Sequence, residues 1–308
     1  MELLKLTITM ITPFATLLKG DTLFGQACWA IREIYGNAAL TNMLSKYNAD
    51  QPMLVCSDAF PAGYLPRPKA PASMLGFASG RIEQRKQDKR KIWMPFAKLG
   101  AALGDWQKHL VDNQQANHET ENWNQPHNTI NRLTSATGTG QFAPYSTALW
   151  QVNSSQSLDI YVLFDRESIS KEQVTTVFQH MGNTGYGKKA TSGLGKFELL
   201  SCVTLPTNNE ATRWLTLAPS LPNEKWLDTA QCFYQPFTRF GRHGGFITHT
   251  GNVYKTPITF IDSGALITAQ SPQTKAYIGQ GLGGDGEISS TLPETVAQAY
   301  SPIMAIGE

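Results

Sequence analysis

One segment of the sequence combines glycines with lysines in a pattern suited to holding phosphate. Residues 182–196 read GNTGYGKKATSGLGK. Because glycine permits positive φ and close backbone approach, successive N–H groups can converge on an anion while the lysines add positive charge. The pattern predicts a shaped phosphate-binding loop, and a flexible linker is the alternative. The expected contacts are Gly185, Tyr186, Gly187, Lys188, Lys189, Ser192, Gly193, Gly195 and Lys196, with Tyr186 placed to stack on a base.

Neither this loop nor a second glycine cluster has the context of a nucleotide-hydrolysing or dinucleotide site. In residues 182–196 no glycine is followed by Lys and then Ser or Thr, and a strand is expected next, so the segment is not a Walker loop. Residues 279–284 (GQGLGG) match the formal GxGxxG pattern, but the sequence that follows does not open a helix. A nucleotide-dependent oxidoreductase is therefore only a remote alternative.

A basic run with an adjoining aromatic residue is a second candidate contact for nucleic acid. Residues 81–91 place six basic side chains in eleven positions, and Trp93 follows. Such a segment can contact phosphates and stack on an unpaired base, so Arg90, Lys91 and Trp93 are candidate RNA contacts. An ordinary solvated surface is the alternative.

The residues that most often perform catalysis are scattered along the chain. The six histidines occur at positions 109, 118, 127, 180, 243 and 249, and none lies in a recognisable catalytic motif. A general acid or base role remains open only for His243, beside a structural role. The four cysteines are widely spaced and form no zinc-binding pattern. We expect neither a metal nor a cofactor.

Composition indicates a folded protein of one large or two ordinary domains. The 308 residues are 41% apolar and 16% charged, with a net charge of +2. No stretch is long and apolar enough to cross a membrane, and the N-terminus does not resemble a signal peptide. We therefore expect a cytoplasmic protein without a membrane segment.

Two strand–helix–strand patterns must position these candidate residues. Apolar and polar residues alternate over residues 3–12, and a helix with one apolar face follows from Asp21 to a stop at Gly36. The pattern returns as a strand over 158–164, a helix capped by Ser170 and a strand over 197–205. This order favours an α+β fold of two ferredoxin-like domains.

The domain boundary is expected near the middle of the chain. Residues 1–150 are predicted to form an N-terminal ferredoxin-like domain with an insertion at about 70–131, where regular patterning weakens. Residues 151–308 are predicted to form a C-terminal ferredoxin-like domain that carries the glycine-rich loop.

Several separated motifs resemble those of a known family. Residues 20–30 (GDTLFGQACWA), 60–68 (FPAGYLPRP), 127–132 (HNTINR) and 254–264 (YKTPITFIDSG) are similar to motifs of the RAMP proteins of CRISPR systems. Within them, the likeness is to the fourth-subunit family of type III-A Csm complexes. Residues 185–197 resemble the signature glycine-rich loop of that superfamily.

The resemblance implies a non-catalytic, RRM-like subunit that binds the 5′ handle of the guide RNA (crRNA). It implies docking against a large polymerase-like CRISPR subunit and a RAMP backbone subunit. Asn128 and Arg132 would contact RNA, and the family's thumb would lie around residues 81–93. A metal-independent endoribonuclease of the same superfamily, which processes precursor guide RNA through a histidine, is the alternative.

Overall fold

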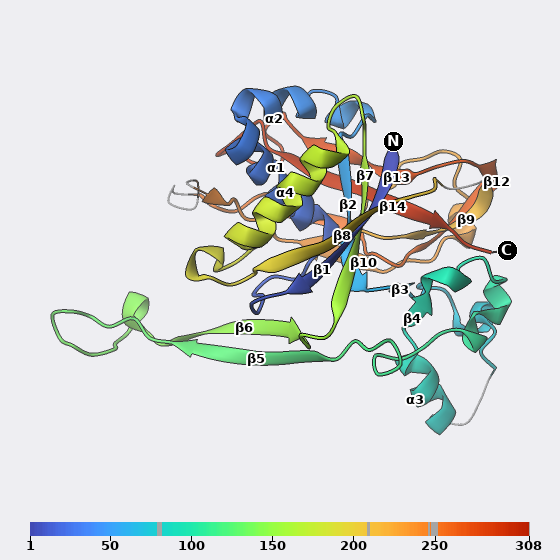
Figure 1. Ribbon diagram of the computed structural model, residues 1–308, viewed down its shortest axis with the longest axis horizontal. Helices are drawn as coiled ribbons and strands as arrows, with labels where there is room; N and C mark the ends of the chain where they lie inside the picture. Colours follow the sequence, from blue (N-terminus) through green and yellow to red (C-terminus); the bar gives the residue numbers. More distant parts are fainter. Residues whose placement is uncertain (79–81, 208–209, 246, 248–251, 308) are drawn as a thin grey trace.

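A four-stranded antiparallel sheet with two helices on one face forms the first half of the fold (Figure 1). The computed structural model describes residues 1–78, 82–207, 210–245, 247 and 252–307. The sheet order is β2-β7-β1-β8. Its elements are β1 (Glu2–Met10), α1 (Gly20–Tyr35), β2 (Leu54–Pro61), β7 (Ser157–Phe164), α4 (Lys171–Thr184) and β8 (Phe197–Leu205). This β-α-β-β-α-β order with β1 in the interior is that of a ferredoxin-like domain.

The local elements follow from the sequence patterns. The alternation predicted for residues 3–12 is confirmed, because Leu4, Leu6 and Ile8 of β1 are fully buried. Ser170 caps α4 as predicted, and its side chain and that of Gln173 form a capping box. The cap of α1 differs from expectation: the helix begins at Gly20, after Lys19, without a side-chain cap.

Strand pairing contradicts the predicted boundary at residue 150. β1 pairs with β7 on one side and with β8 on the other, so residues on both sides of position 150 share one sheet. The assignment of the glycine-rich loop to a C-terminal domain is therefore wrong, because the loop joins α4 to β8. Alternation along a strand shows which face is buried but not which strand lies beside it, and this is the physical reason for the error.

The second half of the chain forms another antiparallel sheet. Its order is β12-β9-β14-β13, from β9 (Ala211–Thr216), β12 (Leu266–Gln273), β13 (Tyr277–Gly283) and β14 (Val296–Ala305). This order departs from the ferredoxin-like pattern, and within the described part of the chain no α-helix follows α4. The predicted α+β class is confirmed for the chain as a whole.

The second sheet has both faces covered without helices of its own. Tyr300 and Met304 of β14 join the main core with α1, whereas Ile303 joins a smaller cluster with Trp214. The two sheets meet along β2, where the Gln298 side chain accepts from the Cys56 N–H at 2.8 Å and donates to the Cys56 carbonyl at 2.7 Å. α1 therefore packs against both sheets.

Residues between β2 and β7 form the predicted insertion, which extends beyond 70–131. It contains a small sheet, an exposed helix and a long hairpin that projects from the body (Figure 1). These are β3 (Tyr64–Pro66), β4 (Trp93–Pro95), α3 (Ile82–Arg90), β5 (Thr120–His127) and β6 (Tyr145–Val152). The projecting element is thus the β5–β6 hairpin and not the segment 81–93, of which Arg81 lies outside the described residues.

Short elements complete the chain. They are α2 (Asn37–Leu44), β10 (Pro236–Arg239), β11 (Ile258–Ile261) and the 3-10 helices η1 (Tyr47–Ala49), η2 (Ala72–Leu75), η3 (Phe96–Lys98), η4 (Leu103–Lys108), η5 (Gly140–Phe142), η6 (Ala190–Ser192) and η7 (Thr229–Gln231). Among the described residues, no helix has the length and apolar character needed to span a bilayer.

Candidate nucleic-acid interface

The glycine-rich loop has the unusual backbone that its sequence predicts. Gly185, Gly187, Gly193 and Gly195 all have positive φ, between +74° and +96°. At Gly195 a Cβ atom would lie 2.2 Å from the carbonyl oxygen of Tyr186. The glycines therefore allow the chain to fold tightly on itself between α4 and β8.

Substituting Gly195 should test this close approach. Gly195→Ala places a side chain at φ +74° and against the Tyr186 backbone, whereas Gly193→Ala has φ +87° but open space within 4 Å. We expect Gly193→Ala to lower the free energy of unfolding by about 1–2 kcal/mol. Gly195→Ala should cost about 1–2 kcal/mol more, because the backbone must shift. Urea unfolding of the two variants measures the difference, and equal midpoints would contradict the close contact.

Most main-chain amides of the loop already donate hydrogen bonds within the protein. The Tyr186 N–H donates to the Gly195 carbonyl, and the Gly195 N–H donates to the Pro13 carbonyl, both at 2.9 Å. The Lys188 N–H donates to Thr16 Oγ1 at 2.9 Å. Further amides donate within the protein: those of Gly185, Ala190, Ser192, Gly193, Leu194 and Lys196. The predicted anion pocket of converging amides is therefore wrong, because the chain between β1 and α1 and the loop's own turns supply the acceptors.

Tyr186 is part of the core and not a stacking platform. It is 0% exposed, its ring lies 6.0 Å from that of Phe14, and its hydroxyl donates to the Leu17 carbonyl at 2.9 Å. Burial raises the pKa of the Tyr186 phenol well above its ordinary value. The expected stacking of this ring on a base is wrong.

The loop instead presents side chains to solvent. Lys188 and Ser192 are exposed, and Lys189 and Lys196 are half-buried. Lys189 reaches the hairpin: its Nζ donates to the Tyr145 hydroxyl at 3.0 Å and lies 5.1 Å from the centre of that ring. Loop and hairpin therefore meet at one place.

The outer end of the paired hairpin strands carries an aromatic pair that was not among the predicted contacts. His127 and Tyr145 face each other across β5 and β6, with ring centres 5.0 Å apart and an interplanar angle of 16°. Tyr145 is 42% exposed. Its position after a polar, glycine-containing segment was visible in the sequence, but its proximity to Lys189 was not.

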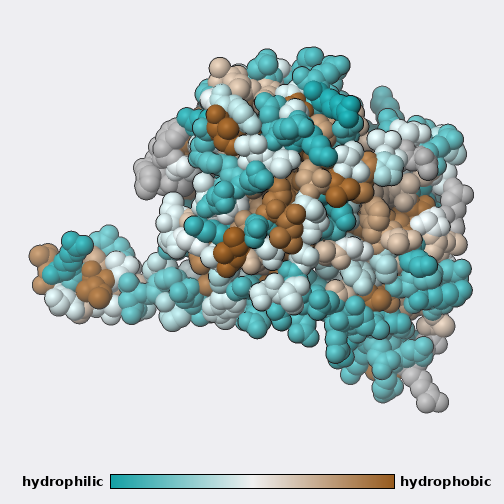
Figure 2. All heavy atoms as spheres, in the orientation of Figure 1, coloured by the Kyte–Doolittle hydropathy of each residue, from teal (hydrophilic) through white to brown (hydrophobic). Residues whose placement is uncertain are grey.

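The predicted contacts Asn128 and Arg132 lie beyond this pair, in the segment 128–144 that closes the hairpin. Both are exposed. Ile130 and Leu133 beside them are 59% and 96% exposed, and apolar atoms are visible at the end of the hairpin (Figure 2). The hairpin thus extends the surface of the loop outward.

The three remaining predicted contacts lie elsewhere. Arg90 ends α3, Lys91 follows it and Trp93 begins β4, at the opposite end of the molecule from the hairpin tip (Figure 1). The Trp93 indole is held in place, because its Nε1 donates to Asn113 Oδ1 at 2.6 Å and its ring meets the edge of His118. The structure does not bring these residues to the glycine-rich loop.

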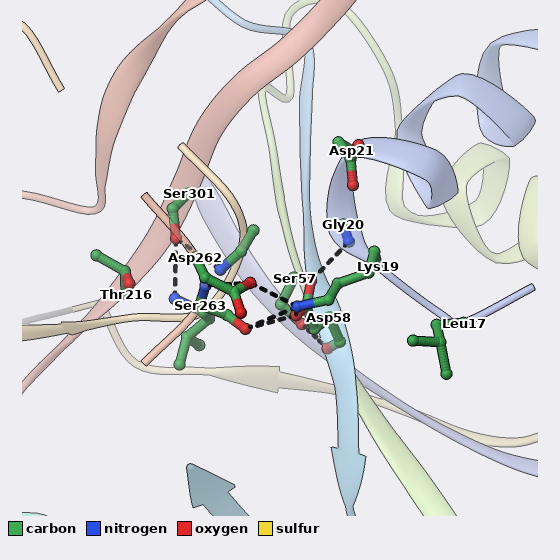
Figure 3. Close-up of polar contacts among 12 residues, drawn as sticks. Leu17, Lys19, Gly20, Asp21, Ser57, Asp58, Thr216, Asp262, Ser263 and Ser301 are labelled. Atoms are coloured by element: carbon green, nitrogen blue, oxygen red, sulfur yellow. Dashed lines mark hydrogen bonds and ion pairs between the residues drawn. The ribbon is translucent and has the colours of Figure 1, made fainter. Parts of the chain in front are cut away.

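A buried ion cluster holds the chain at Lys19, close in sequence to Leu17 (Figure 3). Lys19 Nζ lies 2.9 Å from Asp58 Oδ2 and 2.6 Å from Asp262 Oδ1. Asp58 also accepts from the Gly20 N–H at 2.8 Å and from the Ser263 hydroxyl at 2.6 Å. Burial alone would lower the pKa of Lys19, but Asp58 and Asp262 together raise it, so the ammonium is retained. The cluster fixes the chain just after Leu17, which accepts from Tyr186.

The arrangement offers cations and aromatic rings but no metal site. Among the residues described, no group of three or more His, Cys, Asp or Glu side chains could hold a metal ion. What the site can do is bind: lysines can neutralise phosphates and the His127–Tyr145 pair can contact a base.

Comparisons with known proteins identify the fold. No family model matches the sequence, and no curated protein matches it. Solved structures do match along the full length. A crystal structure of a Csm1–Csm4 cassette in complex with pppApA aligns with a TM-score of 0.60 and 14% identity, covering 98% of each chain. A Csm3–Csm4 subcomplex of the type III-A CRISPR-Cas interference complex aligns with a TM-score of 0.57 and 12% identity, covering 100% of each chain.

At these identities the likeness is one of fold, and it extends over both sheets and the insertion. Csm4 is the component that the two assemblies have in common, and the fold of this chain is similar to that of the aligned chains throughout its length.

Proposed function

We propose that this chain is a non-catalytic, RNA-binding subunit of a type III CRISPR ribonucleoprotein, and that it captures the 5′ handle of the guide RNA in antiviral defence. The observation that carries the proposal is the contact between Lys189 and Tyr145, which joins the glycine-rich loop to the outer end of the β5–β6 strands. The result is one surface with the exposed Lys188 and the half-buried Lys189 beside a stacked aromatic pair. Such surfaces suit single-stranded RNA, whose phosphates and unstacked bases are both accessible.

Each group on this surface has a distinct role in the proposal. Lys188, Lys189 and Lys196 bind phosphates, and the Tyr145 ring stacks on an unpaired base. Arg132, with its planar fork of donors, and Asn128 contact the strand farther along the hairpin. Arg90, Lys91 and Trp93 form at most a separate contact, because they lie at the other end of the molecule.

The proposed partners are suggested by the assemblies to which the aligned structures belong. The structures that align with this chain include assemblies with Csm1 and with Csm3. We propose that this chain likewise docks a large polymerase-like subunit and a RAMP backbone subunit, in the cytoplasm. Co-expression with the two neighbouring subunits should yield a complex that retains short RNAs with a common 5′ end.

The contacts of His243 and His180 do not favour the endoribonuclease alternative. His243 is 6% exposed and its Nε2 lies 2.7 Å from the Ser289 hydroxyl. His180 pairs with Glu33 at 2.7 Å, and His127 is stacked on Tyr145. His243 and His180 are thus engaged within the protein, whereas the Nε2 of His127, beside the proposed RNA surface, has no hydrogen-bond partner among the described residues. The His127→Ala variant, tested for cleavage of repeat RNA, decides whether this imidazole acts as a general acid or base.

Replacing both loop lysines tests the proposal. The double variant Lys188→Ala and Lys189→Ala should bind handle RNA roughly tenfold more weakly, because charge-assisted contacts to phosphate are lost. The slope of log K against log salt should fall by about 1.4, since each neutralised phosphate on a single strand contributes about 0.7. Fluorescence anisotropy over a salt series measures both quantities.

The matched control is the double variant Arg90→Ala and Lys91→Ala, which removes the same charge at the far end of the molecule. It should leave the affinity and the salt slope close to those of the unaltered protein. The reverse pattern, with a loss only in the α3 variant, would place the RNA at α3 and contradict the proposed site.

A further inference from the structure

A small hollow lies in the second half of the chain, away from the loop lysines. It encloses about 300 Å³ between residues 252–256 and 286–290. Its lining includes Asn252, Tyr254, Lys255, Thr256, Ser289 and Ser290. The volume is at the lower end of the range for small-molecule sites, so it suits one small group and not a long peptide.

The two walls of the hollow are fixed to each other by hydrogen bonds. The Thr256 N–H donates to the Ile288 carbonyl at 2.9 Å, and the Thr256 hydroxyl donates to the Glu287 carbonyl at 2.6 Å. At the other end the Thr291 hydroxyl donates to the Asn252 carbonyl at 2.9 Å. The hollow is therefore formed before any ligand arrives, which reduces the entropic cost of binding.

Lys255 lines this hollow and carries an ammonium without a close counter-ion. Its stem packs against Gly241, and its main-chain N–H donates to the Gly241 carbonyl at 2.9 Å. Among the described residues no carboxylate lies within 4.0 Å of its ammonium, and residues 246–251 contain no Asp or Glu. Asp21, whose charge also acts on Lys255, is already engaged by Arg239 through two hydrogen bonds of 2.6 and 2.8 Å.

Burial lowers the pKa of Lys255, against the opposing effects of Cys28 and Asp21. A partly buried ammonium without a partner is unfavourable, and a bound anion would remove that cost. Hydroxyl groups beside it suit the same guest. Ser289 contacts the imidazole of His243, whose pKa is lowered by burial and by Lys255, so the imidazole adds no charge near pH 7. Ser290 is exposed at the rim.

A cation–aromatic pair stands next to this anion-binding group. Tyr254 is 61% exposed, and the Arg242 guanidinium lies 5.0 Å from the centre of its ring. Arginine and tyrosine together suit a nucleobase, which can stack on either plane. Asp285 and Glu287 flank the wall, but both are exposed and neither lines the hollow. An acidic peptide could use the Arg242 cation but not the ring of Tyr254.

We propose that this hollow, the Lys255 pocket, binds one phosphate-bearing nucleotide. Lys255 and the exposed Ser290 hydroxyl hold the phosphate, and Tyr254 with Arg242 holds the base. The nucleotide is either free in solution or part of an RNA strand. Binding of a nucleotide within an RNA strand rests on the proposed function, whereas binding of a free nucleotide does not.

The test compares three variants of the full chain. Lys255→Met keeps the stem against Gly241 and removes the charge, Lys255→Arg restores the charge, and Lys225→Met removes an exposed lysine elsewhere. Each is titrated with adenosine monophosphate and, separately, with a short single-stranded RNA. We expect Lys255→Met to weaken at least one of the two about tenfold, Lys255→Arg to restore most of it, and Lys225→Met to change neither.

The two titrations distinguish a free nucleotide from a nucleotide of an RNA strand. A loss for adenosine monophosphate alone identifies a free nucleotide, a loss for RNA alone identifies a nucleotide of the strand, and a loss for both supports a pocket open to either. If the unaltered protein binds no RNA, the proposed function fails while the monophosphate titration still tests the pocket. Unchanged binding of both ligands in Lys255→Met overturns the inference, as does a loss confined to binding of a partner subunit. The melting temperature of Lys255→Met should not fall, because the lost charge had no partner.

Discussion

Replacing Lys19 with Met should lower the free energy of unfolding by about 3–5 kcal/mol, the usual cost of removing one member of a buried ion pair. Lys19 Nζ is the cation shared by Asp58 and Asp262, at 2.9 and 2.6 Å (Figure 3). Asp58 is only 4% exposed, so its carboxylate would be left without a counter-ion and beside a second negative charge. Urea denaturation followed by circular dichroism measures the loss.

Two further variants show whether the effect comes from the stranded carboxylate. Adding Asp58→Asn to Lys19→Met should recover part of the stability, because the charge without a partner is removed. Lys108→Met breaks the exposed pair with Asp105 and should leave the urea midpoint almost unchanged. A Lys19→Met variant as stable as the unaltered protein would contradict the structural role of the cluster.

The ion cluster illustrates what the sequence does not reveal. The sequence pattern predicts a helix from Asp21 and gives no partner for either Lys19 or Asp21. In the structure Lys19 binds Asp262, which is 243 residues away, and Asp21 binds Arg239, 218 residues away. No local pattern carries such a pairing, because it depends on how the second half of the chain packs against β2. The local elements themselves, such as the Ser170 capping box, depend only on near neighbours and were predictable.

In the candidate site, too, the local backbone was predictable from the sequence and the contacts between distant segments were not. The glycine-rich loop was identified correctly as a shaped segment, since its positive φ values follow from its glycines. The sequence analysis assigned phosphate binding to its main-chain amides. The fold engages amides of the loop instead, because Pro13 and Thr16 in the segment between β1 and α1 act as acceptors. Tyr145 was not predicted as an RNA contact for a similar reason. Its proposed role depends on the approach of Lys189, which only the fold shows.

Replacing Tyr186 with Ala should lower the free energy of unfolding by about 3–5 kcal/mol and also weaken RNA binding. The ring is fully buried beside Phe14, so its removal leaves a cavity under the loop. Without this anchor the loop that presents Lys188 and Lys189 loses its fixed geometry. Thermal unfolding and RNA titration of one protein preparation measure the two effects together.

Tyr186→Phe separates the anchoring role from direct contact with RNA. It keeps the ring in the core and removes only the hydrogen bond to the Leu17 carbonyl, so it should cost about 1 kcal/mol and leave RNA affinity intact. A variant Tyr186→Ala that lost RNA binding at unaltered stability would show that the ring touches RNA after all. We expect stability and RNA affinity to fall together in Tyr186→Ala. The reason is that the buried Tyr186 side chain holds the backbone of the loop, and this backbone positions the lysines that bind RNA.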